Sequence, residues 1–501
     1  MLSLPKPSEL GWASQGRGGT LPQAPNQHLV ALVSCLRPSS PRLNPTAVIA
    51  ISRTWRFSPL GGAVYWPVRR PAFLPGRSLM GNIGSVRLAF VWLMVNVLSL
   101  CGVAQPLPTS TPGAEGLDAR SLDRMHALVQ EYVTAGRHAG AVSLVARHGK
   151  LVDLRAYGYR DLEAKLPMEP DTIMRIYSMT KVITGVAALQ LFEHGRFRLS
   201  DPVTNWIPEL ANPTVCVGGT PDNPKLEPAR TPITIKMLMN HTAGYTYDDD
   251  YSPKLVAEIY KRANLWDSPS LDEFVGKLAK LPLVSQPGTE FNYGVGFDVL
   301  GLLIERISGE KFNAYCEKHI LEPLGMEDTG FDVPPEKISR LARLYEHDPD
   351  GKLREAKVRS GVYAEKDRGI AGGGGGAFST IGDYARFAQM LLNGGQLDGA
   401  RILGRKTVEF ALANSLSHLP RVTYSWSESD GWGLICAVRI DLGKGDDLGS
   451  IGAFSWNGFA TTDFLADPRE QLLMLYFAQY VPEDDQMYMK FRNTVYQALS
   501  D

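Results

Sequence analysis

The 501-residue sequence is poor in cysteine and nearly neutral in charge. Its five cysteines include no C-x-x-C pair and no Cys/His spacing, so we expect neither a zinc site nor a disulfide framework. The formal net charge is −1, and the acidic balance outside residues 1–79 argues against a nucleic acid as the main partner. The motif G-x-S-x-G is also absent, which argues against one common arrangement of a nucleophilic serine with a histidine and an acid.

Charge is distributed unevenly along the chain. Residues 1–79 hold nine Lys or Arg side chains and a single acid, Glu9, which leaves 43 basic and 52 acidic residues in the remainder. The same stretch is rich in proline and has no sustained apolar period, so we predict that it is disordered or absent from the mature protein. We interpret it as a non-native extension of the reading frame upstream of a start at Met80.

A secretory signal peptide is predicted for residues 80–104. Arg87 precedes an apolar run from Leu88 to Leu100, and small residues follow up to Ala104. The run is shorter than a membrane span requires, so we expect export to the periplasm or the medium. Two alternatives would tether the protein to the membrane: an uncleaved N-terminal anchor, or a lipid on Cys101, although Leu100 stands where lipoproteins usually have a small residue.

The remaining sequence predicts a linker followed by one domain. Residues 105–116 combine proline, threonine and glycine, which favours a linker, and the domain spans residues 117–501. Apolar residues at helical spacing predict an opening helix around residues 122–132 and a closing helix around residues 487–495. Strands are expected at residues 141–146, 151–156, 434–440, 450–455, 461–466 and 471–477. The predicted fold is α/β: an antiparallel sheet flanked by the N- and C-terminal helices, with an inserted, mainly helical lobe.

The segment Ser178-Met179-Thr180-Lys181 opens an apolar helix that stops at Gly195. Residues three apart on a helix are neighbours, so we expect the amine of Lys181 beside the hydroxyl of Ser178. A buried lysine can lose its proton near neutral pH and then act as the base for a serine nucleophile. For S-x-x-K alone an exposed serine and lysine would be the commoner explanation, so the rest of the sequence has to support the motif.

Six segments in the same order resemble the superfamily of serine β-lactamases, penicillin-binding proteins and class C-like esterases. The resemblance covers residues 122–498 and rests on SMTKVITGVAALQLFEHGRFRLSDPVTNWIPEL, TIKMLMNHTAGYTY, PGTEFNYGVGFDVLGLLIERISG, ILEPLGMEDTGF, GGGGGAFSTIGDYARFAQMLLNGG and FSWNGFATTDFLADP. It implies a β-lactamase/transpeptidase-like fold in which Ser178 is acylated. It also implies that Tyr293, as phenol or phenolate, works with Lys181 to relay a proton to the leaving group.

Two departures from the family's pattern concern the substrate pocket. Val295 stands where lactamases and carboxypeptidases usually have asparagine, and Trp456-Asn457-Gly458 stands in place of Lys-Thr-Gly. The lysine would hold a substrate carboxylate and the asparagine a side-chain carbonyl, so losing both favours neutral esters. The resemblance also implies an oxyanion hole formed by the backbone N–H groups of Ser178 and Phe459.

Other conspicuous residues receive simpler interpretations. Gly372–Gly376 lacks the G-K-[ST] of a phosphate loop, so we expect a turn that approaches the site. His241 resembles a structural histidine of the family and is not expected to be catalytic. Aromatic residues are more often core than pocket, and only Trp456 is tied to the site by motif; the other candidates for an apolar pocket are Tyr245, Tyr247, Trp426 and Trp432. We include Tyr245 in the predicted pocket.

The sequence therefore predicts an exported serine hydrolase that forms an acyl-enzyme on Ser178, acts on small neutral esters and needs no metal or organic cofactor. A β-lactamase or D-alanyl-D-alanine carboxypeptidase with the same nucleophile is the alternative, and acyl transfer to an acceptor other than water stays open. The alternative from another class is a non-catalytic, penicillin-recognising protein of the cell envelope. The expected partner is a small-molecule ester or lactam, and the oligomeric state, monomeric or higher, is left open.

Overall fold

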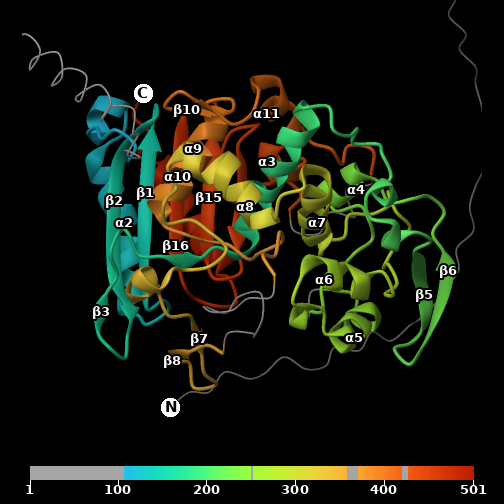
Figure 1. The fold of residues 1–501 in the computed structure, drawn as a ribbon. Helices are drawn as coiled ribbons and strands as arrows, with labels where there is room; N and C mark the ends of the chain where they lie inside the picture. The colour runs from blue at the N-terminus through green and yellow to red at the C-terminus, as the bar shows by residue number, and fades with distance from the viewer. Residues whose placement is uncertain (1–105, 250–251, 358–369, 420–426) are drawn as a thin grey trace, which may run out of the picture. The chain divides into compact units, whose positions relative to one another are not determined.

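An eight-stranded antiparallel sheet forms the centre of the folded part (Figure 1). The computed structural model describes residues 106–249, 252–357, 370–419 and 427–501. The strands lie in the order β12-β13-β14-β15-β16-β1-β2-β3, so segments from both ends of the domain meet where β16 pairs with β1. Their bounds are Gly140–Arg147 (β1), Lys150–Asp161 (β2), Leu166–Pro167 (β3), Asp430–Trp432 (β12), Ala437–Arg439 (β13), Phe454–Gly458 (β14), Thr462–Asp467 (β15) and Leu472–Ala478 (β16).

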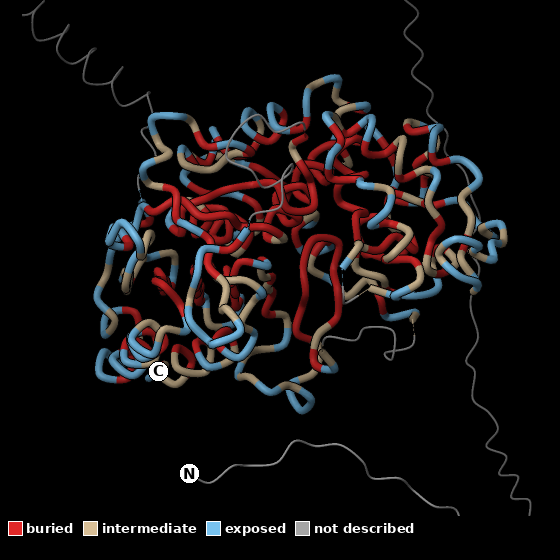
Figure 2. The backbone as a smooth tube through the Cα atoms, turned by 90° about the horizontal axis from the view of Figure 1, so that it is seen from below, coloured by how far each residue is buried: buried red, intermediate tan, exposed pale blue. Residues whose placement is uncertain are grey.

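The sheet is covered on both faces. Successive side chains of a strand point to opposite faces, and every residue of β1 is buried. Val142 and Leu144 join a core that includes α3 and α10, whereas Ala141 and Val145 pack with α2 and α12. This double burial explains why the sequence of β1 is almost continuously apolar. Figure 2 shows long runs of buried residues through the middle of the folded part and exposed residues along its outer loops.

Helices surround the sheet and form a lobe beside it. Figure 1 places α4 to α7 and the hairpin of β5 and β6 on the side of the sheet away from α2. The helices are Ala119–Thr134 (α2), Thr180–Glu193 (α3), Ile235–Met239 (α4), Lys254–Ala263 (α5), Leu271–Leu278 (α6), Gly296–Ser308 (α7), Phe312–Cys316 (α8), Glu322–Leu324 (α9), Ile381–Leu392 (α10), Arg405–Ala411 (α11) and Asp485–Tyr496 (α12). The remaining strands are Met174–Arg175 (β4), Thr214–Thr220 (β5), Asn223–Pro228 (β6), Tyr345–His347 (β7), Leu353–Glu355 (β8), Phe378–Ser379 (β9), Gln396–Leu397 (β10) and Ala400–Arg401 (β11).

Helix α3 is the central helix of the domain. Residues Thr180 to Leu191 are all buried, as expected for a helix that is apolar on every side. It packs against α7 of the helical lobe. A Cβ on Gly185 would lie 2.5 Å from a methyl carbon of Ile435, so only glycine allows this close approach. The helix that carries the S-x-x-K motif is therefore enclosed by the rest of the domain.

The predicted α/β architecture is confirmed, with differences at the level of single elements. The opening and closing helices appear as α2 and α12, and the hairpin as β1 and β2. Residues 434–440 contain only the three-residue strand β13, and the strand expected at residues 450–455 begins at Phe454. The delay arises because Ser450 accepts a turn hydrogen bond from Ala453, and Gly452 has a φ of +91°. Strand β12 was not anticipated.

Residues 106–116, expected to belong to a linker, pack against the domain instead. Leu107 is buried, and the backbone N–H of Ser110 donates to the carbonyl of Leu151. The carboxylate of Glu115 is buried and accepts hydrogen bonds from Lys150, Ser110 and His148, which lower its pKa to about 2. The prediction of a linker was wrong because it rested on composition, whereas the contacts of the buried leucine and acid are with β1, β2 and the turn between them.

The predicted extension, residues 1–79, and the predicted signal peptide, residues 80–104, lie outside the described residues. Within the described ranges, no helix is long and apolar enough to span a membrane.

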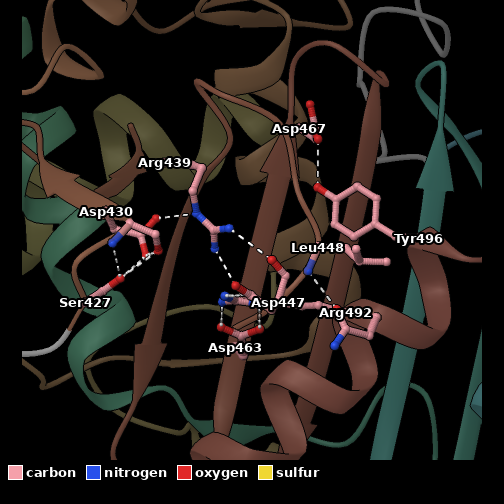
Figure 3. A network of polar contacts seen from close by, with 11 residues as sticks. Ser427, Asp430, Arg439, Asp447, Leu448, Asp463, Asp467, Arg492 and Tyr496 are labelled. Carbon is pink, nitrogen blue, oxygen red and sulfur yellow. Dashed lines mark hydrogen bonds and ion pairs between the residues drawn. The ribbon is translucent and has the colours of Figure 1, made fainter. Parts of the chain in front are cut away.

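A network of ion pairs holds α12 to the sheet (Figure 3). Arg492 of α12 contacts Asp463 of β15 at 2.7 Å and Asp447 at 3.3 Å. Arg439 of β13 contacts the same Asp447 at 2.5 Å and Asp430 at 2.7 Å. Asp447 thereby links the two guanidinium groups, and each arginine is matched by two carboxylates.

Candidate active site

Ser178 lies in a tight turn between β4 and α3. Residues Tyr177–Met179 form a single 3₁₀ turn, and α3 begins at the next residue. The sequence places Ser178 at the start of the helix; the structure places it in the turn just before. Tyr177 has a φ of +40°, which is unfavourable for a bulky side chain. Such strain persists only where the surroundings enforce it, and here the N–H of Ile176 is tied to the carbonyl of Ala377.

The amine of Lys181 lies beside Ser178, as the three-residue spacing predicts. Its Nζ is 3.0 Å from the Ser178 Oγ and 2.6 Å from the carbonyl oxygen of Gly374. The side chain of Lys181 is fully buried. Burial lowers the pKa of Lys181 to about 7, against the opposing influence of the carboxylates of Asp298 and Asp249. A substantial fraction of this amine is therefore neutral, and able to accept a proton, near pH 7.

Tyr293 lies beside Ser178 and Lys181. It hydrogen-bonds to the side chain of Ser178 and accepts a hydrogen bond from Trp456 Nε1 at 3.2 Å. The Lys181 Nζ lies 4.6 Å from the centre of its ring. Burial raises the pKa of Tyr293 well above its ordinary value, although the hydrogen bonds to Ser178 and Trp456 oppose the shift. The geometry thus favours the phenol over the phenolate at neutral pH.

Aromatic side chains from distant segments surround the Tyr293 ring. Trp456 of β14 lies 5.5 Å away between ring centres, Tyr247 lies 5.6 Å away and His241 lies 4.5 Å away. Trp432 meets Trp456 edge to face at 4.5 Å, and its indole N–H donates to the carbonyl of Met239. Such packing fixes the orientation of the Tyr293 ring and gives the site an apolar wall.

His241 has a structural position, in agreement with its interpretation from the sequence. The ring is buried among aromatic neighbours, and burial lowers its pKa well below the ordinary value, with the charge of Lys181 acting in the same direction. The imidazole is therefore neutral at pH 7. Its ring supports Tyr293 from behind, while its backbone carbonyl accepts the N–H of Asn292 at 2.7 Å.

The glycine-rich segment reaches the site, as expected, and brings a residue that the sequence did not single out. Besides the Gly374 carbonyl on Lys181, the Gly373 carbonyl accepts the hydroxyl of Thr184 at 2.7 Å. The Gly374 N–H donates to the carboxylate of Asp298, which is fully buried on α7. One signal could have revealed Asp298: it is an acid within the apolar run GVGFDVLGLL, five residues after Tyr293.

The end of β14 lies against the turn that carries Ser178. A Cβ on Gly458 would be 2.3 Å from the carbonyl oxygen of Ile176, so β14 can approach the turn only because this residue is glycine. Phe459 follows directly, and its half-exposed ring packs edge to face against Tyr177 at 6.0 Å. Phe459 is thus adjacent to the turn that carries Ser178.

The other predicted pocket residues have different surroundings. Tyr245 is buried in the main core, whereas Tyr247 has its ring 5.4 Å from the Lys181 Nζ. Val295 is buried just before α7. Asn457 pairs in register with Asp463, which binds Arg492 of α12, so it faces the side of the sheet away from Trp456. Trp426 lies outside the described residues.

Comparison with known proteins identifies the family. The family model called Beta-lactamase matches residues 125–497, which is most of the chain. The chain is 35% identical over 371 residues to Protein Rv1367c of Mycobacterium tuberculosis, an alignment covering 72% of this chain and 91% of that protein. It is also 35% identical over 259 residues to Esterase EstB of Burkholderia gladioli, covering 50% of this chain and 61% of the esterase.

A solved structure agrees with these sequence matches. Unliganded simvastatin synthase (LovD) from Aspergillus terreus is similar with a TM-score of 0.66 and 26% identity, covering 76% of this chain and 98% of the synthase. The long family match and the shared fold agree with the serine, lysine and tyrosine gathered at the start of α3. The chain belongs to the Beta-lactamase family and is a serine hydrolase.

Proposed function

We propose that the protein hydrolyses small neutral esters through an acyl-enzyme on Ser178. The observation that carries this proposal is the contact between the Ser178 Oγ and the buried Lys181 Nζ at 3.0 Å. An amine with a pKa of about 7 is a suitable base at physiological pH, because it is deprotonated often enough and still accepts a proton readily. The likeness to Esterase EstB supports an ester as the substrate.

The positions of three side chains support a route for acylation. Lys181 takes the proton of the Ser178 hydroxyl as the Oγ attacks the ester carbonyl. The negative charge that develops on the carbonyl oxygen is stabilised by the backbone N–H groups of Ser178 and Phe459. When the tetrahedral intermediate collapses, the departing alkoxide takes the phenolic proton of Tyr293, which regains a proton from Lys181. The alcohol leaves, and the acyl group stays on Ser178.

Deacylation uses the same groups in reverse. A water molecule attacks the acyl carbonyl and gives its proton to the Tyr293 and Lys181 relay, and the proton then returns to the Ser178 oxygen as the acid is released. The raised pKa of Tyr293 suits its role as proton donor in acylation, because a phenol that keeps its proton can donate it only to a strong base such as an alkoxide.

Charge around the site supports neutral substrates. Trp456 occupies the strand position of the family's lysine and directs an indole N–H, instead of a cation, toward Tyr293. Asp249 acts electrostatically on Lys181, and Glu483, whose pKa burial raises to about 7, acts on Tyr293 when it is ionised. Acidic neighbours disfavour a substrate that carries its own carboxylate, as penicillins and peptidoglycan stem peptides do.

A fluorophosphonate and a substrate panel test the proposal. Intact-mass spectrometry should find one adduct on the wild-type protein and none on Ser178→Ala. Short p-nitrophenyl esters should then turn over faster than nitrocefin and than peptides ending in D-alanyl-D-alanine. Faster nitrocefin or peptide cleavage would replace the esterase with a β-lactamase or carboxypeptidase, and absence of any adduct would favour a non-catalytic binding protein.

Export remains part of the proposal. The basic residue, short apolar run and small residues of 80–104 support a signal peptide. N-terminal sequencing of protein from fractionated cells should give a mature chain that begins after Ala104. Abundant peptides from before Met80, or a protein retained with the membrane, would contradict cleavage there.

A further inference from the structure

A buried carboxylate lies one peptide unit away from Lys181. Asp298 of α7 is completely buried, and its Oδ1 accepts the N–H of Gly374 at 2.9 Å. Among the described residues, its Oδ2 has no hydrogen-bond partner. Burying a carboxylate with so few partners is costly, so the position calls for a reason beyond packing.

The carboxylate is packed directly against the glycine-rich turn. A Cβ on Gly374 would lie 2.4 Å from the Asp298 Oδ2, and a Cβ on Gly373 would lie 2.3 Å from the carbonyl oxygen of Phe297. Side chains at either glycine would push the turn away from the start of α7. The glycines are therefore required for the close approach that the hydrogen bond to Asp298 needs.

A single residue joins this carboxylate to the proposed base. The N–H of Gly374 binds Asp298, and the carbonyl oxygen of Gly374 accepts the Lys181 Nζ at 2.6 Å. The same Nζ lies 3.0 Å from the Ser178 Oγ. Moving Gly374 would therefore move an acceptor that orients the amine, and a displacement of about 1 Å in such a site can cost about 100-fold in rate.

We propose that Asp298 is a positioning residue, which fixes Gly374 so that its carbonyl holds Lys181 toward Ser178, with its carboxylate one peptide unit from the amine. The inference rests on the proposed function of Ser178 and Lys181. It assigns no contact between Asp298 and the substrate, because the carboxylate acts through the Gly374 peptide and through the electric field.

Other ionisable groups also face Lys181, and their charges determine how far a change at Asp298 can shift the pKa of the amine. Asp249, from the segment after α4, is the second carboxylate that raises the pKa of Lys181, and its influence is smaller than that of Asp298. His241 is neutral, and Tyr247 and Tyr293 present their rings to the amine. Removing the charge of Asp298 therefore removes the larger of the two acidic influences on Lys181.

The pH dependence of fluorophosphonate labelling at Ser178 tests the inference in Asp298→Asn and Asp298→Ala. The asparagine keeps an oxygen for the Gly374 N–H but has no charge, so Lys181 should lose its proton more readily. In a plot of labelling rate against pH, the rising limb should move about 0.5 to 1 pH unit lower, and the plateau at high pH should stay nearly unchanged. The alanine loses the acceptor as well, and its plateau should fall about 10- to 100-fold.

Asp383→Asn is the matched control. Asp383 is also a largely buried carboxylate that accepts a backbone N–H, that of Asp328 at 2.8 Å, but its charged neighbours are Asp328 and Lys337. This variant should leave the position of the limb unchanged. The positioning role is wrong if Asp298→Asn also leaves the position of the rising limb unchanged. It is also wrong if the plateau labelling rate falls by the same factor in Asp298→Asn and Asp298→Ala.

The labelling experiment separates the inference from the proposed ester substrate. A wild-type protein that labels at Ser178 but turns over no ester would refute the substrate and leave the Asp298 comparison valid. A wild-type protein that hydrolyses esters, with no shift of the labelling limb in Asp298→Asn, would refute the inference alone.

Discussion

Two regions of the folded part bury cationic side chains, and the two differ in how many carboxylates contact the cation. In the network of Figure 3, Arg439 and Arg492 each contact two carboxylates, and Asp447 is shared between them. At the candidate active site, Lys181 is buried still more completely, but its hydrogen bonds go to a serine hydroxyl and a peptide carbonyl.

The difference appears in the pKa values of the two cations. Burial by itself would lower the pKa of Arg492, but the adjacent carboxylates of Asp463 and Asp447 outweigh it and raise the pKa. For Lys181 burial dominates, and the pKa falls to about 7 because Asp298 and Asp249 compensate only partly. The paired carboxylates thus keep Arg492 protonated, whereas Lys181, with weaker acidic compensation, can lose its proton near neutral pH.

The largest expected effect comes from removing the proposed base. Lys181→Met should lower ester turnover at least about 1,000-fold, because Ser178 would lose its proton acceptor. Thermal stability should stay the same or rise, since a poorly paired buried cation is removed. Lys181→Arg is the control for charge, because arginine keeps its proton and should be equally inactive. Substantial turnover by the arginine variant would show that Lys181 is not the base.

The opposite result is expected in the paired region. Arg492→Met should destabilise the protein by about 3–5 kcal/mol, because it leaves the buried carboxylate of Asp463 without its partner. Chemical denaturation measures the loss, and fluorophosphonate labelling per folded molecule should be unchanged. Arg492→Lys keeps the charge but not the two-pronged geometry, so its loss should be smaller. A loss of labelling without a loss of stability would show that the ion-pair network affects the active site directly, which contradicts its assignment to stability alone.

Removing the phenolic proton tests the second member of the relay. Tyr293→Phe should lower ester turnover about 100-fold or more, while the aromatic packing is retained. The loss should be larger for alcohols that are poor leaving groups than for p-nitrophenol, because only the former need a proton on departure. Equal losses with both classes of ester would argue against Tyr293 as the proton donor.

The pH profile should reflect the titration of Lys181. The proposed base is the neutral amine, so kcat/KM should fall about tenfold per pH unit below about 7 and level off above it. Tyr293 keeps its proton well into the alkaline range, because burial raises its pKa, so we expect no loss from this group between pH 8 and about 10. A profile independent of pH between about 5.5 and 8 would contradict the lowered pKa of Lys181.

The smallest effect is expected at Trp456. Trp456→Phe removes the N–H that donates to Tyr293 at 3.2 Å but keeps an aromatic ring, so turnover should fall only about 3- to 10-fold. Trp432→Phe is a suitable comparison, since its indole N–H binds the carbonyl of Met239 instead. Measured kcat values for a short p-nitrophenyl ester distinguish the two. A larger loss in Trp432→Phe would mean that ring packing matters more than the hydrogen bond.

Local sequence patterns predicted some parts of the protein well. The two end helices and the first hairpin follow from apolar spacing, and the contact of Ser178 with Lys181 follows from their separation by one helical turn. The contact between Asp298 and Gly374 joins positions 76 residues apart, which no local pattern encodes. The packing of residues 106–116 depends in the same way on distant partners, so composition alone suggested a linker.

Local sequence patterns also did not predict the direction in which each side chain points. Trp456 and Asn457 are adjacent in one motif, yet alternation along β14 and the pairing with β15 send them to opposite faces of the sheet. Tyr245 and Tyr247 lie two residues apart, and only Tyr247 brings its ring to Lys181 among the contacts of the described residues. A motif names residues near a site, but the folded backbone decides which side chains reach it, through strand register in β14 and through the loop after α4.

The sequence by itself determined the order of elements, the S-x-x-K spacing and the family, because these depend on residues that are close together in the chain or on whole segments. Only the tertiary structure decided the chemistry of Lys181. Its lowered pKa arises from burial between α3, α7 and the glycine-rich turn, with a single peptide unit separating it from Asp298. Burial and distant charges set the proton affinity of an amine, and both exist only after the chain has folded.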